Sequence, residues 1–433
     1  MNLRRTDLQL IGVTAALVLV GLLMVGSASQ VLGAAQGDPS YYLTNQLWKL
    51  LPGLALMFLF WRLPYQKIAK WTKPLLVLSF VMLGLVFTQN LGAEANSARR
   101  WLSLGFISFQ PSELAKLFLI LYLAQTLTRK RDRLSGFKQG LLPSLAVLVL
   151  AMGLVLLQPD LSTAVMLFIT GYVIFWVAGV PTRHILATLA VLIPLAVLAV
   201  YLEPYRWARI TAFVDPWKVA DGSGYQSVQS LLAIGSGRLT GVGLGASQQK
   251  LFYLPEAHTD FIFSILAEEL GLFGSLLVVS LFGLLVALGI RTAMRCSDPF
   301  GRLLATGITA LFGVQAIVNI GVVTALLPTT GLPLPFVSYG GTSLIVSLAA
   351  MGMLAGVARQ SAETVTVQAG EEAPVARRKA YFNRPPAPAP ARGPAYSVGE
   401  HRASRAAAFK GIGVYSPADR SRRSSTYRWR RWS

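Results

Sequence analysis

The sequence has few charged residues and few side chains of the kinds that bind metals. Charged residues make up 13% of its 433 residues and hydrophobic residues 54%, whereas about a quarter of a water-soluble domain is charged. The single cysteine, Cys296, excludes a disulfide framework and any multi-cysteine metal or iron–sulfur site. The three histidines, His184, His258 and His401, are too far apart in sequence for a local zinc motif. This composition indicates an integral membrane protein and argues against a bound redox centre.

Ten apolar stretches in the first 359 residues predict ten transmembrane helices. They cover approximately residues 8–25, 47–60, 74–88, 113–127, 141–157, 162–179, 185–202, 261–290, 303–326 and 340–358. With the N-terminus in the cytoplasm, the cytoplasmic segments hold fifteen Lys and Arg residues and the short outer loops hold only Arg99 and Arg100. The sequence therefore predicts an all-α polytopic membrane protein with both termini in the cytoplasm.

Two long regions lie outside the predicted helices. Residues 203–260 form a large extracytoplasmic loop between the seventh and eighth spans, and loops of this length are often functional. Within it, residues 225–234 predict a short amphipathic helix on the bilayer surface. Because the chain after residue 359 is rich in Pro, Ala, Ser and Arg, we expect a membrane domain of residues 1–359 and a disordered, basic cytoplasmic tail of residues 360–433. The basic charge of the tail favours binding to anionic lipid, then docking to a cytosolic partner, and least of all binding to nucleic acid.

Charged residues within or beside a membrane span are costly, so each needs a physical reason. Glu113 and Lys116 share a helix face, and two interpretations remain open. They form a functional ion pair that faces a cavity, or Glu113 is an ordinary acidic residue in a first helical turn. Asp260 is either a functional carboxylate or the N-cap of the eighth span. Ser264 and Glu268 follow it at intervals of four, and Glu269 is next to them. This polar stripe on an apolar helix predicts a polar cavity or a partner helix.

Two stretches rich in glycine or proline fall outside the predicted spans. Residues 235–245 lack the Gly-Lys-Ser/Thr ending of a P-loop and follow no strand, which argues against P-loop and dinucleotide-binding folds. Their flexible backbone, with Arg238 and Lys250 nearby, is able to approach a phosphate. The composition of residues 327–342 predicts non-helical backbone at the level of the membrane, which is tolerated where it is buried in protein or lines a cavity. His258, considered alone, is interpreted as a hydrogen-bonding loop residue rather than as a metal ligand.

Several of these stretches, in this order along the chain, together resemble the SEDS family (shape, elongation, division and sporulation). The matching residues are Gly26–Ser29, Arg100–Gly105, Phe109–Lys116, Gln158–Leu161, Leu254–Phe263 with Glu268 and Glu269, and Pro333–Gly341. The resemblance covers nearly all of residues 8–358 and leaves out the basic tail. Ala257, where the rod-elongation branch usually has a charged residue, and the long tail favour the cell-division branch.

The resemblance implies a ten-span α-helical SEDS fold and a peptidoglycan glycosyltransferase. Such an enzyme polymerises lipid II at the outer face of the plasma membrane, at the division septum for this branch. The family's partners are a class B penicillin-binding protein, which is the transpeptidase, and other divisome proteins. The residue that matches the family's catalytic aspartate is Asp260, and those that match residues important for activity are Trp101, Glu113 and Lys116.

The chemistry of the reaction is consistent with one general base. A lipid pyrophosphate is already a good leaving group, so Asp260 only has to accept a proton from the acceptor's sugar 4-hydroxyl, which attacks and inverts the donor's anomeric carbon. Charge compensation for the pyrophosphate is expected from outer-loop cations, with a divalent Mg²⁺ or Mn²⁺ ion as an alternative and no permanently bound cofactor. The candidate substrate-binding residues are then Trp101, Glu113, Lys116, Arg206, Arg209, Arg238, Lys250, His258, Glu268 and Glu269.

Two rival functions use the same residues. The intramembrane charges are also compatible with a path that flips lipid II across the bilayer, although they cluster toward the outer half under the predicted topology. The chain is also compatible with a scaffold that only recruits the transpeptidase. Polymerisation by purified protein, and its loss when Asp260 is replaced, separate the enzyme from both alternatives.

Overall fold

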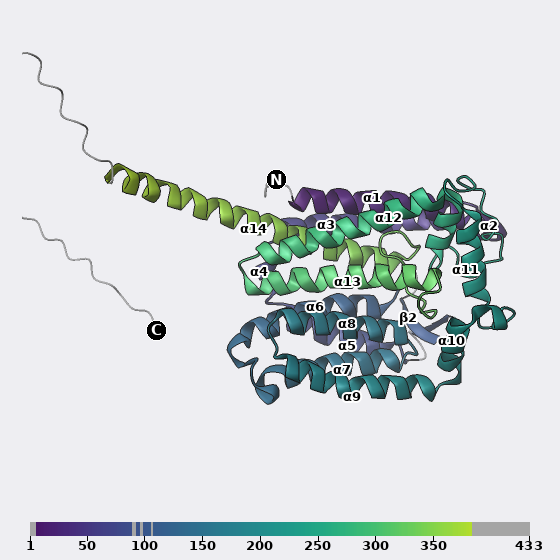
Figure 1. Ribbon diagram of the computed structural model, residues 1–433, viewed down its shortest axis with the longest axis horizontal. Helices are drawn as coiled ribbons and strands as arrows, with labels where there is room; N and C mark the ends of the chain where they lie inside the picture. Colours follow the sequence, from purple (N-terminus) through teal and green to yellow (C-terminus); the bar gives the residue numbers. More distant parts are fainter. Residues whose placement is uncertain (1–5, 89–91, 96–97, 105–106, 383–433) are drawn as a thin grey trace, which may run out of the picture. The chain divides into compact units, whose positions relative to one another are not determined.

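The computed structural model describes residues 6–88, 92–95, 98–104 and 107–382 of the chain. Contacts divide the chain into two units, residues 1–375 and residues 376–433, and nearly all described elements belong to the first. That unit is a bundle of long helices whose axes run side by side (Figure 1). The long helices are α1 (Thr6–Ala28), α3 (Tyr41–Arg62), α5 (Thr72–Leu85), α6 (Pro111–Arg129), α7 (Leu142–Leu156), α8 (Leu161–Val177), α9 (Thr182–Tyr201), α12 (Ile262–Arg295), α13 (Pro299–Val323) and α14 (Gly341–Phe382).

Each of the ten predicted spans falls on one of these helices. Six helical segments of the described chain are long and apolar enough to cross a membrane, and α5 and α8 are shorter apolar helices. The mainly helical, multi-pass membrane fold is therefore confirmed, while ten as the number of membrane crossings stays a prediction. The last helix continues past the expected boundary at residue 359 to Phe382, and residues 383–433 of the predicted tail lie outside the described residues.

The core of the bundle lies around α13. This helix packs against α12, α8 and α6, and most of its apolar span is buried in protein. It begins after Asp298, whose carboxylate accepts a hydrogen bond from the Gly301 amide at 3.0 Å, with Pro299 at the first helical position. By contrast, α9 contacts mainly α8 and α10 and exposes nearly all of its apolar surface, as a helix facing lipid does.

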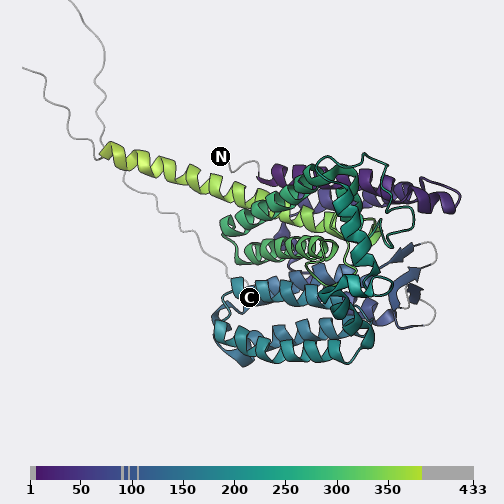
Figure 2. The ribbon, with the colours of Figure 1, turned by 45° about the vertical axis from the view of Figure 1, so that its right-hand side comes forward.

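A small β-sheet, which the sequence did not predict, lies between α5 and α6. Strands β1 (Gly92–Ala95), β2 (Ala98–Leu104) and β3 (Ile107–Phe109) pair antiparallel in the order β1-β2-β3. The remaining short elements near the bundle ends are α2 (Gln30–Ala35), α4 (Tyr65–Ile68), η2 (Arg131–Arg133) and η3 (Phe137–Leu141). The sheet and α2 lie at one end of the bundle, together with α11 (Figure 2). We call this the loop end.

The predicted outer loop contains three helices: α10 (Pro204–Val214), η4 (Pro216–Val219) and α11 (Tyr225–Ser236). The helix predicted for residues 225–234 is α11, and it packs against α12 and α13 at the loop end (Figure 1). The buried hydroxyl of Ser230 shares a hydrogen bond with that of Ser264 on α12 at 2.7 Å and donates to the carbonyl of Val323 at 2.6 Å. One face of α11 is therefore fixed to the bundle, and its position on a bilayer surface stays a prediction.

The glycine-rich stretch packs against a break in α12 and supplies hydrogen-bond partners there. At Gly271 the backbone has φ 65° and ψ −161°, which is not helical, so some amide and carbonyl groups there have no partner within the helix. Residues 238–243 provide these partners through backbone hydrogen bonds from Val242 to Glu268, Gly243 to Glu269, Leu272 to Arg238 and Phe273 to Leu239, at 3.0 to 3.2 Å. A Cβ at Gly241 would lie 2.1 Å from a carbonyl oxygen of α12, so only glycine permits this approach.

Candidate active site

Asp260 lies at the loop end, just before α12, and its backbone is held from two sides. Asn319 of α13 donates its side-chain amide to the Asp260 carbonyl at 2.7 Å and to the Leu332 carbonyl at 2.7 Å. The Ser338 hydroxyl donates to the carbonyl of Thr259 at 2.6 Å. The segment that the sequence marked as broken backbone, residues 327–342, is thus the frame that positions Asp260.

The carboxylate of Asp260 is partly exposed and makes no hydrogen bond or ion pair with any residue that the structure describes. The interpretation of Asp260 as a helix N-cap is wrong, because Phe261 occupies that position and no side chain caps α12 there. Most of the volume around the carboxylate is protein. This burial, together with the negative charges of Glu256 and Asp160, outweighs Arg209 and Arg100 and raises the pKa of Asp260 to about 7. An unpaired carboxylate with this pKa is suited to accept a proton near neutral pH.

Two arginines act on this carboxylate electrostatically, and each is fixed by neighbouring backbone. Arg209 of α10 donates to the Thr329 carbonyl at 3.0 Å and to the hydroxyl of Tyr205, over whose ring it lies. Arg100 of β2 donates to the carbonyls of Gln158, at 3.1 Å, and Pro159. Both lower the pKa of Asp260, so both are within electrostatic reach of it. Sequence reasoning nominated Arg209 and omitted Arg100, although Arg100 opens one of the motif stretches.

The other two nominated arginines are not brought to Asp260 by any contact of the described residues. Arg206 donates to the Ala199 carbonyl at 3.0 Å, which joins α10 to the end of α9. Arg238 is exposed, and its carbonyl accepts one of the hydrogen bonds at the break in α12. Their role in binding substrate stays a prediction.

Asp160 provides a structural carboxylate close to the site. It is buried and caps α8, accepting from the Thr163 amide at 3.0 Å and from the Thr163 hydroxyl at 2.8 Å. Because both of its oxygens are engaged, Asp160 acts on Asp260 as a fixed negative charge rather than as a second base. It is also next to Gln158 and Pro159, whose carbonyls hold Arg100.

Glu113 and Lys116 form a buried ion pair in the first two turns of α6, with 2.8 Å between Lys116 Nζ and Glu113 Oε1. Glu113 also lies in the acidic first turn of a helix that starts at Pro111, so the structure shows both the ion pair and the helix-start position, and a function of the pair stays a prediction. Lys116 borders a small internal cavity between α6, α8 and α13. Trp101 lies on β2 and is partly exposed, and β3 leads from this sheet directly into α6. Their substrate contacts remain predictions.

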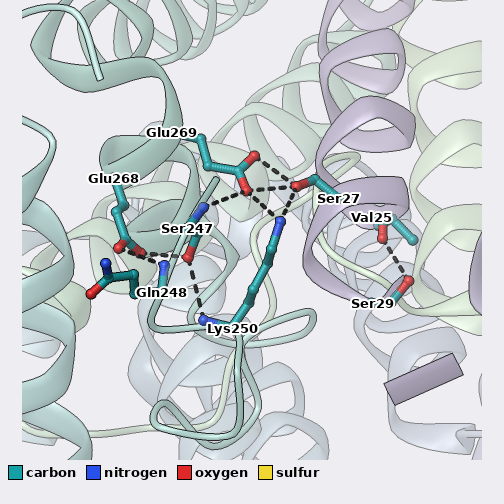
Figure 3. A network of polar contacts seen from close by, with 8 residues as sticks. All are labelled: Val25, Ser27, Ser29, Ser247, Gln248, Lys250, Glu268 and Glu269. Atoms are coloured by element: carbon teal, nitrogen blue, oxygen red, sulfur yellow. Dashed lines mark hydrogen bonds and ion pairs between the residues drawn. The ribbon is translucent and has the colours of Figure 1, made fainter. Parts of the chain in front are cut away.

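Three nominated residues, Lys250, Glu268 and Glu269, lie in the interior, in the network of Figure 3. Lys250 Nζ is 2.9 Å from Glu269 Oε1, and the Ser27 hydroxyl of α1 donates to the same carboxylate at 2.6 and 2.7 Å. Glu268 accepts from the hydroxyl of Ser247 and from the Gln248 amide at 3.0 Å. The polar stripe below Asp260 therefore faces other parts of the chain, and the network joins α1, residues 247–250 and α12.

His258 packs among aromatic rings. Its ring centroid lies 5.0 Å from that of Tyr42 and 5.6 Å from that of Tyr339. Burial lowers the pKa of His258, against the opposing charge of Glu256, so the imidazole is neutral at pH 7. Within the described part of the chain, no group of three or more His, Cys, Asp and Glu residues is arranged to hold a metal ion. The buried Nδ1 of His258 has no hydrogen-bond partner among the described residues, so the structure gives no support to its interpretation as a hydrogen-bonding loop residue.

Together, the fold and this site define a polytopic helical membrane protein with a carboxylate at one end of its bundle that is unpaired among the described residues. The family model described as "Cell cycle protein", which covers FtsW, RodA and SpoVE, matches residues 7–363, and the chain belongs to this family. The probable peptidoglycan glycosyltransferase FtsW of Geobacter metallireducens is 41% identical over 357 residues, which are 82% of this chain and 95% of that protein. Stage V sporulation protein E of Bacillus subtilis is 41% identical over 356 residues, or 82% and 97% of the two chains.

Solved structures agree with this assignment. A chain from a peptidoglycan synthase complex that coordinates polymerization and crosslinking aligns with a TM-score of 0.66 and 34% identity, covering 82% of this chain and 97% of that one. The rod shape determining protein RodA of Thermus thermophilus aligns with a TM-score of 0.58 and 33% identity, covering 82% and 96%. The SEDS family, the fold and the enzyme class predicted from the sequence are confirmed.

Proposed function

We propose that the chain polymerises lipid II into glycan strands during septal peptidoglycan synthesis. The names of its relatives support a peptidoglycan glycosyltransferase of cell division. The mechanism rests on the state of the Asp260 carboxylate. It is unpaired among the described residues, it is partly exposed, and its surroundings raise its pKa to about 7. Asp260 is the general base: it accepts the proton of the acceptor's sugar 4-hydroxyl as that oxygen attacks the donor's anomeric carbon.

The reaction inverts the anomeric carbon and releases undecaprenyl diphosphate. Because the diphosphate leaves as a stabilised anion, it needs no proton from a second carboxyl group, and both oxygens of the nearby Asp160 are engaged as acceptors by Thr163. Arg209 and Arg100 supply fixed positive charge on the Asp260 side of the site. A divalent ion, if the reaction uses one, would be held mainly by the diphosphate, because the described residues lack a metal-ligand cluster.

We place the protein in the plasma membrane at the division septum, with both termini in the cytoplasm and the loop end outside. The asymmetry of Lys and Arg in the loops supports this orientation. A class B penicillin-binding protein is the proposed partner, because one similar structure is a chain of a synthase complex for polymerization and crosslinking. Other divisome proteins are proposed as further partners on the same ground of cell division.

The test uses purified full-length protein, lipid II in detergent and the transpeptidase partner. Asp260→Asn is expected to slow polymerisation by about 10²- to 10⁴-fold, which is the usual contribution of a general base. The variant should still fold, because burial disfavours the charge that it removes. Asp215→Asn is the matched control: Asp215 is in the same loop, paired with Lys218 at 2.9 Å on the surface, and its replacement should leave the rate unchanged.

Two results would contradict the proposal. Retained polymerisation by Asp260→Asn removes Asp260 as the base. Absence of any polymer from the unmodified protein with its partner points instead to a scaffold or, if lipid II crosses vesicle membranes, to a flippase. The buried network of Figure 3 argues against the flippase, because its carboxylates are bonded to other parts of the chain.

A further inference from the structure

Lys49 is a half-buried cation on α3 for which the described residues offer no counter-charge. It lies eight residues after Tyr41, about 12 Å along the helix from its loop-end start. Its ammonium group makes no hydrogen bond or ion pair with any residue that the structure describes, and lies 5.4 Å from the centre of the Tyr339 ring. A cation at this depth is costly without an anionic or hydrogen-bonding partner.

The surroundings of Lys49 increase that cost. Its side chain runs along Gly341, the first residue of α14, where a Cβ would lie 2.1 Å from Lys49 Cδ and 2.9 Å from Nζ. A helix begins with free amide groups and a partial positive charge, so the ammonium and the start of α14 repel each other. An anion bound between them would relieve this repulsion, and Gly341 keeps the space for the Lys49 side chain open.

The backbone that carries Asp260 is tied to the same place. Gln46, one helical turn before Lys49, donates to the Ser338 carbonyl at 3.3 Å and accepts from the Gly340 amide at 3.4 Å. Tyr339, between these two residues, donates its amide to the His258 carbonyl at 3.0 Å. Lys49 and Asp260 are thus linked through one short segment, residues 338–341.

The outer face of α3 indicates what kind of anion fits. Leu47, Trp48 and Leu51 are exposed apolar side chains of the outer face of α3, which suits lipid or an apolar chain. Leu47 and Leu51 point away from Lys49, and Trp48, about a quarter turn from Lys49, is where this face borders it. Other cations near the site are already engaged: Lys250 is ion-paired in the interior, and Arg209 and Arg100 are bonded to backbone carbonyls. Lys49 is the cation that keeps its hydrogen-bond donors free among these four.

The geometry points to Lys49 as a binding residue for the diphosphate group of a polyprenyl diphosphate, with the apolar chain along the exposed face of α3. This assignment rests on the proposed function and deepens it, because lipid II and its leaving group both contain that group. The ammonium donates charge-assisted hydrogen bonds to phosphate oxygens, while the ring of Tyr339, 5.4 Å away, contributes a cation–π contact. Lys49 then acts on binding, and Asp260 on proton transfer.

The test measures binding without turnover. Full-length protein in phosphatidylcholine nanodiscs is titrated with undecaprenyl diphosphate and, separately, with undecaprenol, which has the same chain and no phosphate. Lys49→Met should weaken diphosphate binding about tenfold and leave undecaprenol binding unchanged, while Lys49→Arg should stay within about threefold of the unmodified protein. Lys218→Met, which removes an exposed lysine of the outer loop, is the matched control and should change neither affinity.

Three outcomes would overturn the assignment: equal diphosphate affinity in Lys49→Met, an equal loss of undecaprenol affinity, or displacement of the diphosphate by phosphatidylglycerol in the nanodisc. The last result would make Lys49 a site for anionic headgroups in general. Lys49→Gln is a second neutral variant, measured alongside by thermal unfolding. Because binding is read directly, the result stands apart from the polymerisation test: the diphosphate can bind at Lys49 even if the chain makes no polymer.

Discussion

Removing only one partner of the Lys250–Glu269 ion pair is expected to lower the free energy of unfolding strongly. The Glu269 side chain is 0% exposed and is held by Lys250 at 2.9 Å and by the Ser27 hydroxyl at 2.6 and 2.7 Å. Lys250→Met keeps the length of the side chain and removes the cation, so a buried carboxylate stays with serine and one long amide contact. Breaking a buried pair in this way costs about 3–5 kcal/mol of unfolding free energy.

A double-mutant cycle separates the pair from the packing around it. Glu269→Gln removes the charge that Lys250→Met strands, so the double variant should be more stable than Lys250→Met alone by about 0.5–3 kcal/mol. Unfolding in mixed micelles, followed by tryptophan fluorescence, gives the free energies. A Lys250→Met variant within about 0.5 kcal/mol of the unmodified protein, or a double variant no more stable than that single variant, would contradict a stabilising role of the buried pair.

Two further predictions concern the pH profile and the glycine-rich stretch. Polymerisation should fall about tenfold per pH unit below about pH 7, because Asp260 must be ionised to act as a base and its pKa is raised to about 7; a rate that stays constant from about pH 8 to about pH 5.5 would exclude Asp260. Gly237→Ala should destabilise the protein by about 1–3 kcal/mol in the same unfolding assay, because its Cβ would lie 1.9 Å from the Ala267 carbonyl oxygen. Gly235→Ala, in α11 with no atom within 4 Å of the added Cβ, is the control and should be neutral or stabilising by up to about 1 kcal/mol; equal effects of the two would contradict the packing argument.

The helices were predictable because their apolar residues are local signals. Hydrophobic length alone located all ten, with errors at the ends: the second span was expected from residue 47, whereas α3 begins at Tyr41, because polar and aromatic residues open that helix. The sheet of residues 92–109 was missed, since its strands are short and its pattern, which includes Arg99 and Arg100, is not the alternation of a long strand. The break at Gly271 was also missed, because its hydrogen-bonding partners are some thirty residues away in sequence.

The sequence predicted the site residue whose role depends on its own chemistry, but not the roles that depend on which side chains surround a residue. Asp260 was found from its motif, but only the structure shows that its carboxylate has no partner in the described part of the chain and that Arg100 is near. Lys250 was predicted to be an outer-loop cation that compensates the pyrophosphate charge, since nothing local indicates that Ser27 and Glu269 enclose it. Lys49 was overlooked because a single lysine inside an apolar segment is usually attributed to snorkelling toward the membrane surface.

The backbone pairing between residues 238–243 and the broken part of α12 has a consequence for how the chain tolerates change in length. Two amides of the stretch, those of Val242 and Gly243, donate to α12, and two of its carbonyls, those of Arg238 and Leu239, accept from α12. Adding or removing a single residue between the two pairs would put one pair out of register with its partners. Surface loops usually accept such insertions, but this one supplies bonds that a continuous helix would make for itself. We therefore expect an insertion between Gly241 and Val242 to prevent correct folding, while the same insertion in the exposed turn near Gly222 is tolerated.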